Sequence, residues 1–347
     1  MTVINNYNFL ISNYKPNLAK ALYAIGSTLF LFLSCLIFFV SNPLSLGIDS
    51  FLMFFGLTGI QLRLFMIGHD VGHQLLFKSR WMNDACRILI GSILGAPIIC
   101  WSIGHHYHHK FNGNLTIYKG PMLIISAQEY QHLSTHDQLA YRVSRHPFLM
   151  LVTSGIRYFV VPRLRLLSEA FGHFTSKHNY TPIIQLELIQ QSNTIDVDKT
   201  ERIDTCVCSL LFVLFLAPLF YVSPSIVLIY ILGLLCSTCL ADLIFHMHHN
   251  FEGSYASIGF LWNRDQANYQ GTANIRMPKV LRWFTANIGY HQAHHIWPQI
   301  PFYWLEEASN NIRKNGIYNE ISLSDLFEST KFIVWDVKNS TYRKLAS

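Results

Sequence analysis

Histidine is the residue type whose distribution in this sequence points most directly to chemistry. Twelve of the 17 histidines fall in four short clusters: His69-Asp-Val-Gly-His73, His105-His-Tyr-His108-His109, His246-Met-His248-His249 and His291-Gln-Ala-His294-His295. Residues three or four apart share one face of a helix, so 105, 108 and 109 point the same way, whereas His106 points elsewhere. One such pair alone is more typical of a helix end or a surface. Four clusters together favour metal binding.

The number of imidazoles indicates which kind of metal site to expect. Imidazole suits zinc, copper, iron and nickel, but a tetrahedral zinc uses only three or four protein ligands. The soluble di-iron pattern needs a Glu-x-x-His from each of two helices, and the sequence has one match, Glu129 to His132, outside every cluster. We therefore predict two ions of higher coordination, held by nine ligands: His69, His73, His105, His108, His109, His249, His291, His294 and His295.

The composition predicts that a membrane positions these clusters. Of the 347 residues, 51% are hydrophobic and only 13% are charged, whereas soluble domains carry about 25% charged residues. Four apolar runs are long enough, or nearly so, to cross a bilayer. They pair as two hairpins, turned near 41–43 and 222–225: Ala21–Val40 with Leu44–Gly68, and Thr205–Tyr221 with Ser225–Phe245.

The distribution of basic residues predicts the orientation of the chain. The two hairpin turns hold no Lys or Arg, whereas the other side collects many, which places both termini in the cytoplasm. Two shorter apolar stretches, Ala85–Trp101 and Pro147–Pro162, are interrupted by glycines and by an arginine each. We interpret both as re-entrant or interfacial, provided that the histidine clusters meet. The polar segment Phe171–Arg202 is expected to be cytosolic.

Together these features predict an all-α integral membrane protein. Its four transmembrane helices form two hairpins, joined by two re-entrant or interfacial segments and a cytosolic helical cap that carries the metal site. The predicted domains are a cytosolic N-terminal segment (1–20), a membrane domain (21–310) and a cytosolic C-terminal tail (311–347). We expect an inner (cytoplasmic) membrane location, with the site on the cytoplasmic side.

Around the clusters the sequence resembles the membrane fatty-acid desaturases. Their three histidine boxes, H-D-x-x-H, H-x-x-H-H and H-x-x-H-H, stand here in order. Arg63-Leu-Phe-Met-Ile-Gly-His69, Trp283-Phe-Thr-Ala-Asn-Ile-Gly-Tyr-His291 and His249-Asn-Phe-Glu-Gly253 are similar to segments of bacterial acyl-lipid desaturases of the delta-12 (omega-6) type. The resemblance covers about residues 55–310. The chain departs from the family pattern at His248, where a glutamine is usual, and at Val71, where a cysteine is frequent.

The resemblance implies an O2-dependent desaturase that uses two Fe2+ ions to introduce a cis double bond into a lipid acyl chain. His249 would be the family's extra ligand, and Asp70, Glu252 and Asn287 are candidate acceptors for ligand imidazoles, although solvation of helix ends explains them too. The sequence carries no flavin, nicotinamide or heme motif, so a separate ferredoxin or cytochrome is implied. Exposed cations are expected to steer it, or to face lipid headgroups: Lys110, Lys119, Arg276, Lys279 and Arg282.

Two other functions stay open at this point. A hydroxylase or ketolase of the same superfamily uses the same ligands but adds oxygen to carbon. A divalent-metal transporter is an alternative of a different class, but it calls for ionisable groups near the bilayer midplane. The interiors of Ala21–Val40 and Ser225–Leu240 hold none, which disfavours transport.

Overall fold

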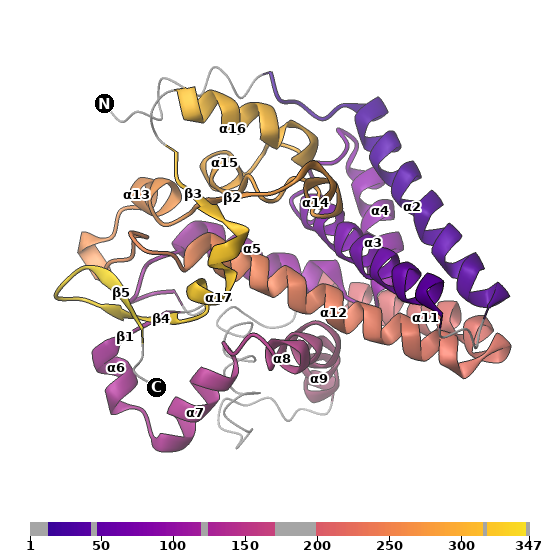
Figure 1. Ribbon diagram of the computed structural model, residues 1–347, viewed down its shortest axis with the longest axis horizontal. Helices are drawn as coiled ribbons and strands as arrows, with labels where there is room; N and C mark the ends of the chain where they lie inside the picture. Colours follow the sequence, from indigo (N-terminus) through magenta and orange to yellow (C-terminus); the bar gives the residue numbers. More distant parts are fainter. Residues whose placement is uncertain (1–12, 43–46, 119–123, 171–198, 315–317, 345–347) are drawn as a thin grey trace.

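Four long apolar helices form the frame of the computed structural model (Figure 1), which describes residues 13–42, 47–118, 124–170, 199–314 and 318–344. They are α2 (Leu18–Ser41), α3 (Ile48–Gly72), α11 (Lys199–Val222) and α12 (Pro224–His249). Each is long and apolar enough to cross a membrane. Asn17 caps α2 by accepting a hydrogen bond from the Lys20 amide, and Pro224 opens α12, where its missing N–H costs nothing.

Two of these helices continue past the limits expected from hydropathy. α3 runs to Gly72 rather than ending at Gly68, and α12 runs to His249 rather than ending at Phe245. Five of the eight extra residues are His or Asp, so the apolar run alone did not predict them. They carry His69, His248 and His249 into regular helix, and thereby fix the direction in which those side chains point.

The stretch predicted as re-entrant or interfacial after α3 forms two helices with a sharp bend between them. These helices are α4 (Arg80–Leu94) and α5 (Ile98–Phe111). The chain bends by 107° between them, as in a broken span or a re-entrant loop. Gly95 adopts a φ of +65° at the bend, a conformation that a side chain disfavours. Pro97 then precedes α5. The bend places the second histidine cluster, on α5, beside α3.

The second interrupted stretch lies along α12. It comprises α8 (Met150–Gly155), a π-helical turn (Ile156–Val160) and α9 (Val161–Ala170). Ser154, Arg157 and Tyr158 all reach the buried carboxylate of Asp242 on α12, with Arg157 at 2.8 Å and the Tyr158 hydroxyl at 2.7 Å. A buried charge needs such partners, so this group holds the two elements together.

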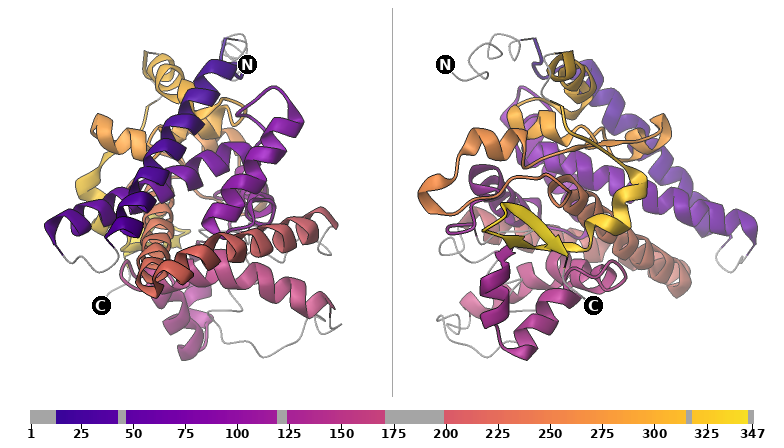
Figure 2. Two further views of the ribbon diagram at one scale, coloured as in Figure 1. Left: turned by 90° about the vertical axis from the view of Figure 1, so that its right-hand side faces the viewer. Right: turned by 60° about the vertical axis from the view of Figure 1, so that its left-hand side comes forward.

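The remaining described residues build a cap at the end of the frame where α12 terminates. Its helices are α6 (Ala127–His132), α7 (Thr135–Val143), α13 (Arg264–Tyr269), α14 (Lys279–Phe284), α15 (His291–Ile296), α16 (Leu305–Lys314) and α17 (Leu326–Ser329), with short turns η3 (Gly259–Leu261), η4 (Phe302–Trp304) and η5 (Leu323–Asp325). Figure 1 and the right view of Figure 2 separate this cap from the turn between α11 and α12.

The described residues include five short strands. The expectation of an all-α chain is therefore wrong in this respect, although the chain is mostly helical. β1 (Ile125–Ser126) pairs in parallel with β4 (Phe332–Asp336), and β5 (Thr341–Lys344) pairs antiparallel with β4. β2 (Asn274–Arg276) pairs in parallel with β3 (Glu320–Ser322). The segment expected as a C-terminal tail thus folds against the cap, with β4 rich in the aromatic and β-branched residues that suit a strand. The domain limits stay predictions.

Some expectations concern positions outside the described residues. Most of the predicted polar segment 171–202 lies there, as do Lys119 and part of the first hairpin turn.

We predict that the contacts of Asp242 contribute strongly to stability. Asp242→Ala leaves the buried Arg157 guanidinium without this carboxylate, and the loss of one partner of a buried pair costs about 3–5 kcal/mol. Thermal unfolding in detergent, followed by tryptophan fluorescence, measures the effect. Glu320→Gln, which breaks the exposed pair with Arg276, is the matched control and should change the unfolding temperature far less. Equal losses in the two variants would contradict this assignment.

Candidate metal centre

The nine histidines predicted as ligands converge at the cap end of the frame. Four elements supply them: α3 with the residue that follows it, α5, the last residue of α12, and α15. They form two groups, in each of which one nitrogen per residue lies within 4.8 Å of the others. The first group is His69, His73, His105, His109 and His294, and the second is His108, His249, His291 and His295.

The second cluster divides between the two groups. The sequence placed 105, 108 and 109 on one helical face, and α5 does present all three inward, yet His105 and His109 join one group while His108 joins the other. α15 divides in a similar way, because His294 joins the first group and His291 and His295 the second. Each of these short helices therefore contributes to both groups.

The Nε2 atoms meet at distances that suit a shared ion. His108 Nε2 lies 3.0 Å from His249 Nε2 and 3.2 Å from His295 Nε2, and His249 Nε2 lies 3.1 Å from His291 Nε2. In the first group, the Nε2 atoms of His105 and His109 are 2.9 Å apart. Nitrogens about 2.1 Å from one ion and at right angles around it lie about 3 Å apart. Both groups thus fit a metal ion.

Unsatisfied ring nitrogens give a second test of the fit. His69 Nε2, His73 Nε2 and both ring nitrogens of His294 are buried without a hydrogen-bond partner among the described residues. Buried polar atoms normally find one, so an ion in the first group explains one such nitrogen on each of these three rings. The donor set is entirely imidazole, which suits iron, zinc or copper rather than calcium or magnesium.

The protonation state also suits metal binding. Burial, reinforced by the neighbouring imidazoles, holds the pKa of His291, His294 and His295 well below the usual range of histidine. Each ring is therefore neutral near pH 7 and keeps a lone pair for a ligand bond.

Contacts on the opposite ring nitrogens fix the orientation of three ligands. Nδ1 of His108 lies 3.0 Å from the Tyr118 hydroxyl, and Nδ1 of His249 lies 3.0 Å from the Gly271 carbonyl oxygen, to which it donates. His69 Nδ1 lies 3.3 Å from the Asp70 carboxylate, whose other oxygen accepts from the Phe302 amide at 2.5 Å. Such partners fix the tautomer and leave Nε2 free for an ion.

Of the three candidate acceptors for ligand imidazoles, only Asp70 lies against one in the described contacts. The Asn287 amide donates to the Phe302 carbonyl oxygen instead, and the Glu252 side chain is exposed. Asn287 has a φ of +58°, which asparagine tolerates better than most residues. A role in shaping the turn before α15 therefore explains it better than contact with an imidazole.

The histidines outside the nine have different surroundings. His106 is exposed at the edge of the site, with its ring 4.9 Å from that of His73. His246 Nε2 donates to the Ser329 carbonyl oxygen, and His248 Nδ1 donates to the Ala273 carbonyl oxygen. The ring of His248 stacks on that of His291 at 4.2 Å. These two residues link α12 to the cap, and neither belongs to a group.

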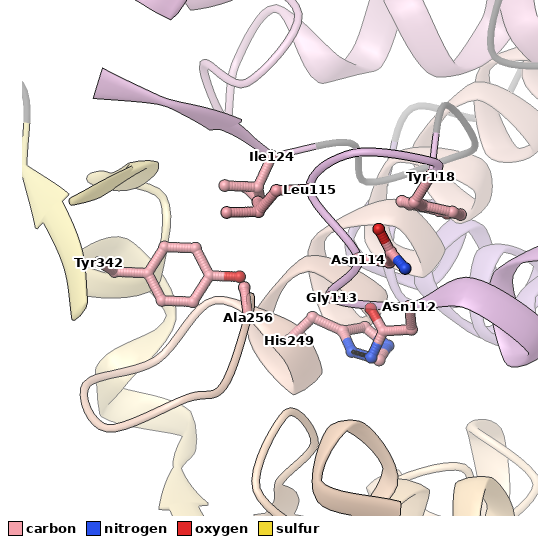
Figure 3. A pocket seen from close by; sticks show the side chains of 9 residues that line it. All are labelled: Asn112, Gly113, Asn114, Leu115, Tyr118, Ile124, His249, Ala256 and Tyr342. Carbon is pink, nitrogen blue, oxygen red and sulfur yellow. Dashed lines mark hydrogen bonds between the residues drawn. The ribbon is translucent and has the colours of Figure 1, made fainter. Parts of the chain in front are cut away.

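A small cavity, about the size of one water molecule, lies beside His249. Figure 3 shows the side chains of His249 and Asn112 close together at one end of it and Tyr342 of β5 at the other. The Asn112 amide lies 3.3 Å from His249 Nδ1. The full lining is Asn112, Gly113, Asn114, Leu115, Tyr118, Ile124, His249, Ala256 and Tyr342.

Sequence reasoning missed Tyr118 and Trp101. Tyr118 follows His108 by ten residues across a turn, and no local pattern connects them. Trp101 stacks on His105 at 4.5 Å and lies one helical turn before it, a spacing that could have indicated the contact. Among the predicted cations, Lys110 and Lys279 are exposed, while Arg276 and Arg282 pair with Glu320 and Glu306.

We predict that Tyr118→Phe weakens metal binding. Loss of the acceptor for His108 Nδ1 lets the ring reorient and costs about 10–100-fold in metal affinity. Titration of the metal-free protein with Fe2+ measures the change. Tyr107→Phe is the matched control, because its hydroxyl donates to the Ile117 carbonyl oxygen rather than to a histidine. Equal affinity of the Tyr118→Phe variant and the unmodified protein would show that this contact does not orient the ligand.

Comparison with known proteins identifies relatives that are named as fatty acid desaturases or acyl-lipid desaturases. A fatty acid desaturase of Bacillus subtilis (strain 168) is 29% identical over 303 residues, which cover 84% of this chain and 78% of the relative. An sn-1 oleoyl-lipid 12-desaturase of Synechocystis is 23% identical over 265 residues, covering 72% of this chain and 64% of the relative. An sn-1 acyl-lipid omega-3 desaturase (ferredoxin) of Nostoc is 34% identical over 110 residues, covering 29% and 28%.

The family model for fatty acid desaturases matches residues 48–324. That range contains all four histidine clusters and the elements that bring them together, from α3 to α16. Since the match covers most of the chain, and since the relatives carry the same name, this chain belongs to the fatty acid desaturase family.

Proposed function

We propose that this oxidoreductase introduces a cis double bond into a lipid acyl chain at a centre of two Fe2+ ions. The two adjacent groups of imidazoles at one end of the apolar helices carry the proposal. When bound, the iron pair would supply the oxidising power that side chains lack. The reaction takes R–CH2–CH2–R′, O2, two electrons and two protons to R–CH=CH–R′ and two H2O.

In this proposal the chain's own residues hold the ions and determine what reaches them. His69, His73, His105, His109 and His294 hold one ion, and His108, His249, His291 and His295 hold the other. Asp70 and Tyr118 keep His69 and His108 in the productive tautomer. Burial of the imidazoles keeps bulk water from the site, which favours oxidation of the substrate over side reactions.

The substrate is proposed to be an acyl chain of a membrane glycerolipid. The Synechocystis relative and a relative from Arthrospira platensis are both named sn-1 oleoyl-lipid 12-desaturases. Since α3 and α12 carry the ligands at the ends of apolar helices, an acyl chain in the bilayer lies beside the same elements.

The electrons are proposed to come from a separate carrier, a ferredoxin or a cytochrome. The name of the Nostoc relative specifies ferredoxin, which favours that class here. We further propose an inner (cytoplasmic) membrane location, with α2–α3 and α11–α12 as two membrane hairpins, α4–α5 as a re-entrant pair and the cap in the cytoplasm. The absence of Lys and Arg from the hairpin turns supports this orientation.

Product analysis tests the proposed reaction. Purified protein, incubated with lipid vesicles, reductant, a ferredoxin and O2, should yield acyl chains that are two hydrogens lighter, measured by mass spectrometry. His108→Ala and His294→Ala should abolish the product, because each removes a ligand from one group. His106→Ala, outside both groups, should retain most of it. A hydroxylated chain as the main product would contradict desaturation.

Accessibility labelling tests the proposed orientation. In a variant that lacks the exposed Cys206, cysteines introduced at Asn42 and Ser223 should react with an impermeant thiol reagent on intact cells. Cysteines at the exposed positions Thr116 and Gln131 should react only after permeabilisation. Labelling of position 116 from outside would place the second histidine box on the opposite face and contradict the proposed topology.

A further inference from the structure

The cap carries an exposed apolar ridge, defined here as Ile258-Gly-Phe-Leu-Trp262 around the turn η3. Phe260 is 94% exposed and Leu261 59%. The ridge is held in place by backbone hydrogen bonds, from Leu261 to Ile258 and from Trp262 to Gly259, and by the Gly259 amide, which donates to the Thr116 hydroxyl at 2.8 Å. Single exposed apolar residues are common, but a group of large ones is typical of an interaction site.

The ridge lies away from the apolar helices that are proposed to face lipid. The segment that leads into α13 lies at the opposite end of the molecule from the α11–α12 turn, as Figure 1 and the right view of Figure 2 show. Exposed apolar residues on the spanning helices are explained by the bilayer. The ridge lies on the cap, so it needs another explanation.

A short chain of contacts connects the ridge to the metal centre. The Trp262 indole N–H donates to the Asn112 carbonyl oxygen at 2.9 Å. The side-chain amide of the same asparagine lies 3.3 Å from Nδ1 of His249. One residue therefore separates a half-buried tryptophan at the surface from a proposed iron ligand. Phe111 lies beside this route, with its ring 6.4 Å from that of Trp262.

The charges around the ridge are mixed. Lys110 and Arg264 are exposed beside it, and Lys110 Nζ lies 5.0 Å from the ring of Phe111. Glu252 and Asp265 lie in the same stretch of chain as the ridge. Apolar contact is therefore expected to supply most of the affinity of a partner, and the two cations to favour an acidic one.

From these observations we propose that the ridge is the docking surface for a small acidic one-electron carrier of the ferredoxin type. Electrons enter along Trp262, Asn112 and His249, as two successive one-electron transfers for each double bond. No bonds form or break in these transfers: two reduced carrier molecules each give up one electron, and the two irons that the histidines would hold would each accept one. This inference rests on the proposed function, because it assigns the site at which the external donor of that reaction binds.

Binding tests the docking surface without turnover. The probe is a fluorescently labelled plant-type [2Fe–2S] ferredoxin, titrated with the detergent-purified full chain and followed by anisotropy. The double variant Phe260→Ser/Leu261→Ser should weaken binding about tenfold or more, as loss of an apolar anchor does. Arg264→Glu should also weaken it. Phe327→Ser is the control, since Phe327 on α17 is a large apolar residue outside the ridge that is as exposed as Leu261, at 59%. Equal affinity of the double variant and the control would overturn the proposal.

Electron transfer tests the route. Trp262→Phe keeps an apolar ring but removes the N–H donor, so the turnover rate at saturating ferredoxin should fall by a larger factor than the affinity for ferredoxin. The amount of double bond formed in one turnover after anaerobic reduction with dithionite and addition of O2 should fall less than the ferredoxin-driven rate, because this reaction bypasses docking. A Trp262→Phe rate equal to that of the unmodified protein would contradict the route. If the unmodified protein forms no double bond after dithionite and O2, the proposed function itself fails.

A bilayer is the other surface that an apolar ridge fits. A fluorophore attached at a Phe260→Cys substitution, in a Cys206→Ser background, reports on this when vesicles contain lipids with nitroxide quenchers. We expect no quenching. Strong quenching would place the ridge in the membrane and overturn the docking proposal.

Discussion

Nine imidazoles share a space from which water is largely excluded, and within each group their ring nitrogens lie close together. Without an ion between them this arrangement is unfavourable, because buried nitrogens such as His69 Nε2 and His73 Nε2 have no other partner in the described contacts. The elements that deliver them must therefore be held together by interactions elsewhere. Buried polar contacts of α3, α12 and the cap provide these interactions.

Several buried polar contacts hold the ligand-bearing elements in place. Arg63, two helical turns before Asp70 on α3, donates to the Thr28 hydroxyl and the Trp283 carbonyl oxygen, and lies 4.0 Å from the Trp283 ring. Asp70 accepts from the Phe302 amide. These contacts connect α3 to the segments that precede and follow α15 in the sequence. The α15 helix itself spans only six residues. A helix that short has little stability of its own, so its position depends on such neighbours.

The end of α12 is fixed in a comparable way by the C-terminal residues. His246 contacts the Ser329 carbonyl oxygen, and the Asn250 amide donates to that of Phe332. His248 reaches the cap at Ala273 and stacks on His291. His246 and His248 thus have structural contacts that join one ligand-bearing helix to the cap. The family's usual glutamine at 248 is replaced here by a ring that can stack.

The sequence predicted the four apolar helices and the family, because hydropathy and the spacing of the histidine boxes are local signals. It did not predict that α5 divides its histidines between two groups, because that depends on where α3, α12 and α15 lie around it. The support of His108 by Tyr118 and the pairing of β4 with β1 join distant segments, and neither leaves a periodic pattern. For Glu252 the sequence left contact with an imidazole and solvation at a helix end equally open, and its side chain is exposed.

The central claim is that the two groups of imidazoles hold two iron ions. Anomalous X-ray scattering from crystals of the purified protein, collected at the iron absorption edge, tests it most directly. The account predicts two iron peaks per chain, one among His69, His73, His105, His109 and His294 and the other among His108, His249, His291 and His295. A single peak, or peaks that appear only at the zinc edge, would contradict it.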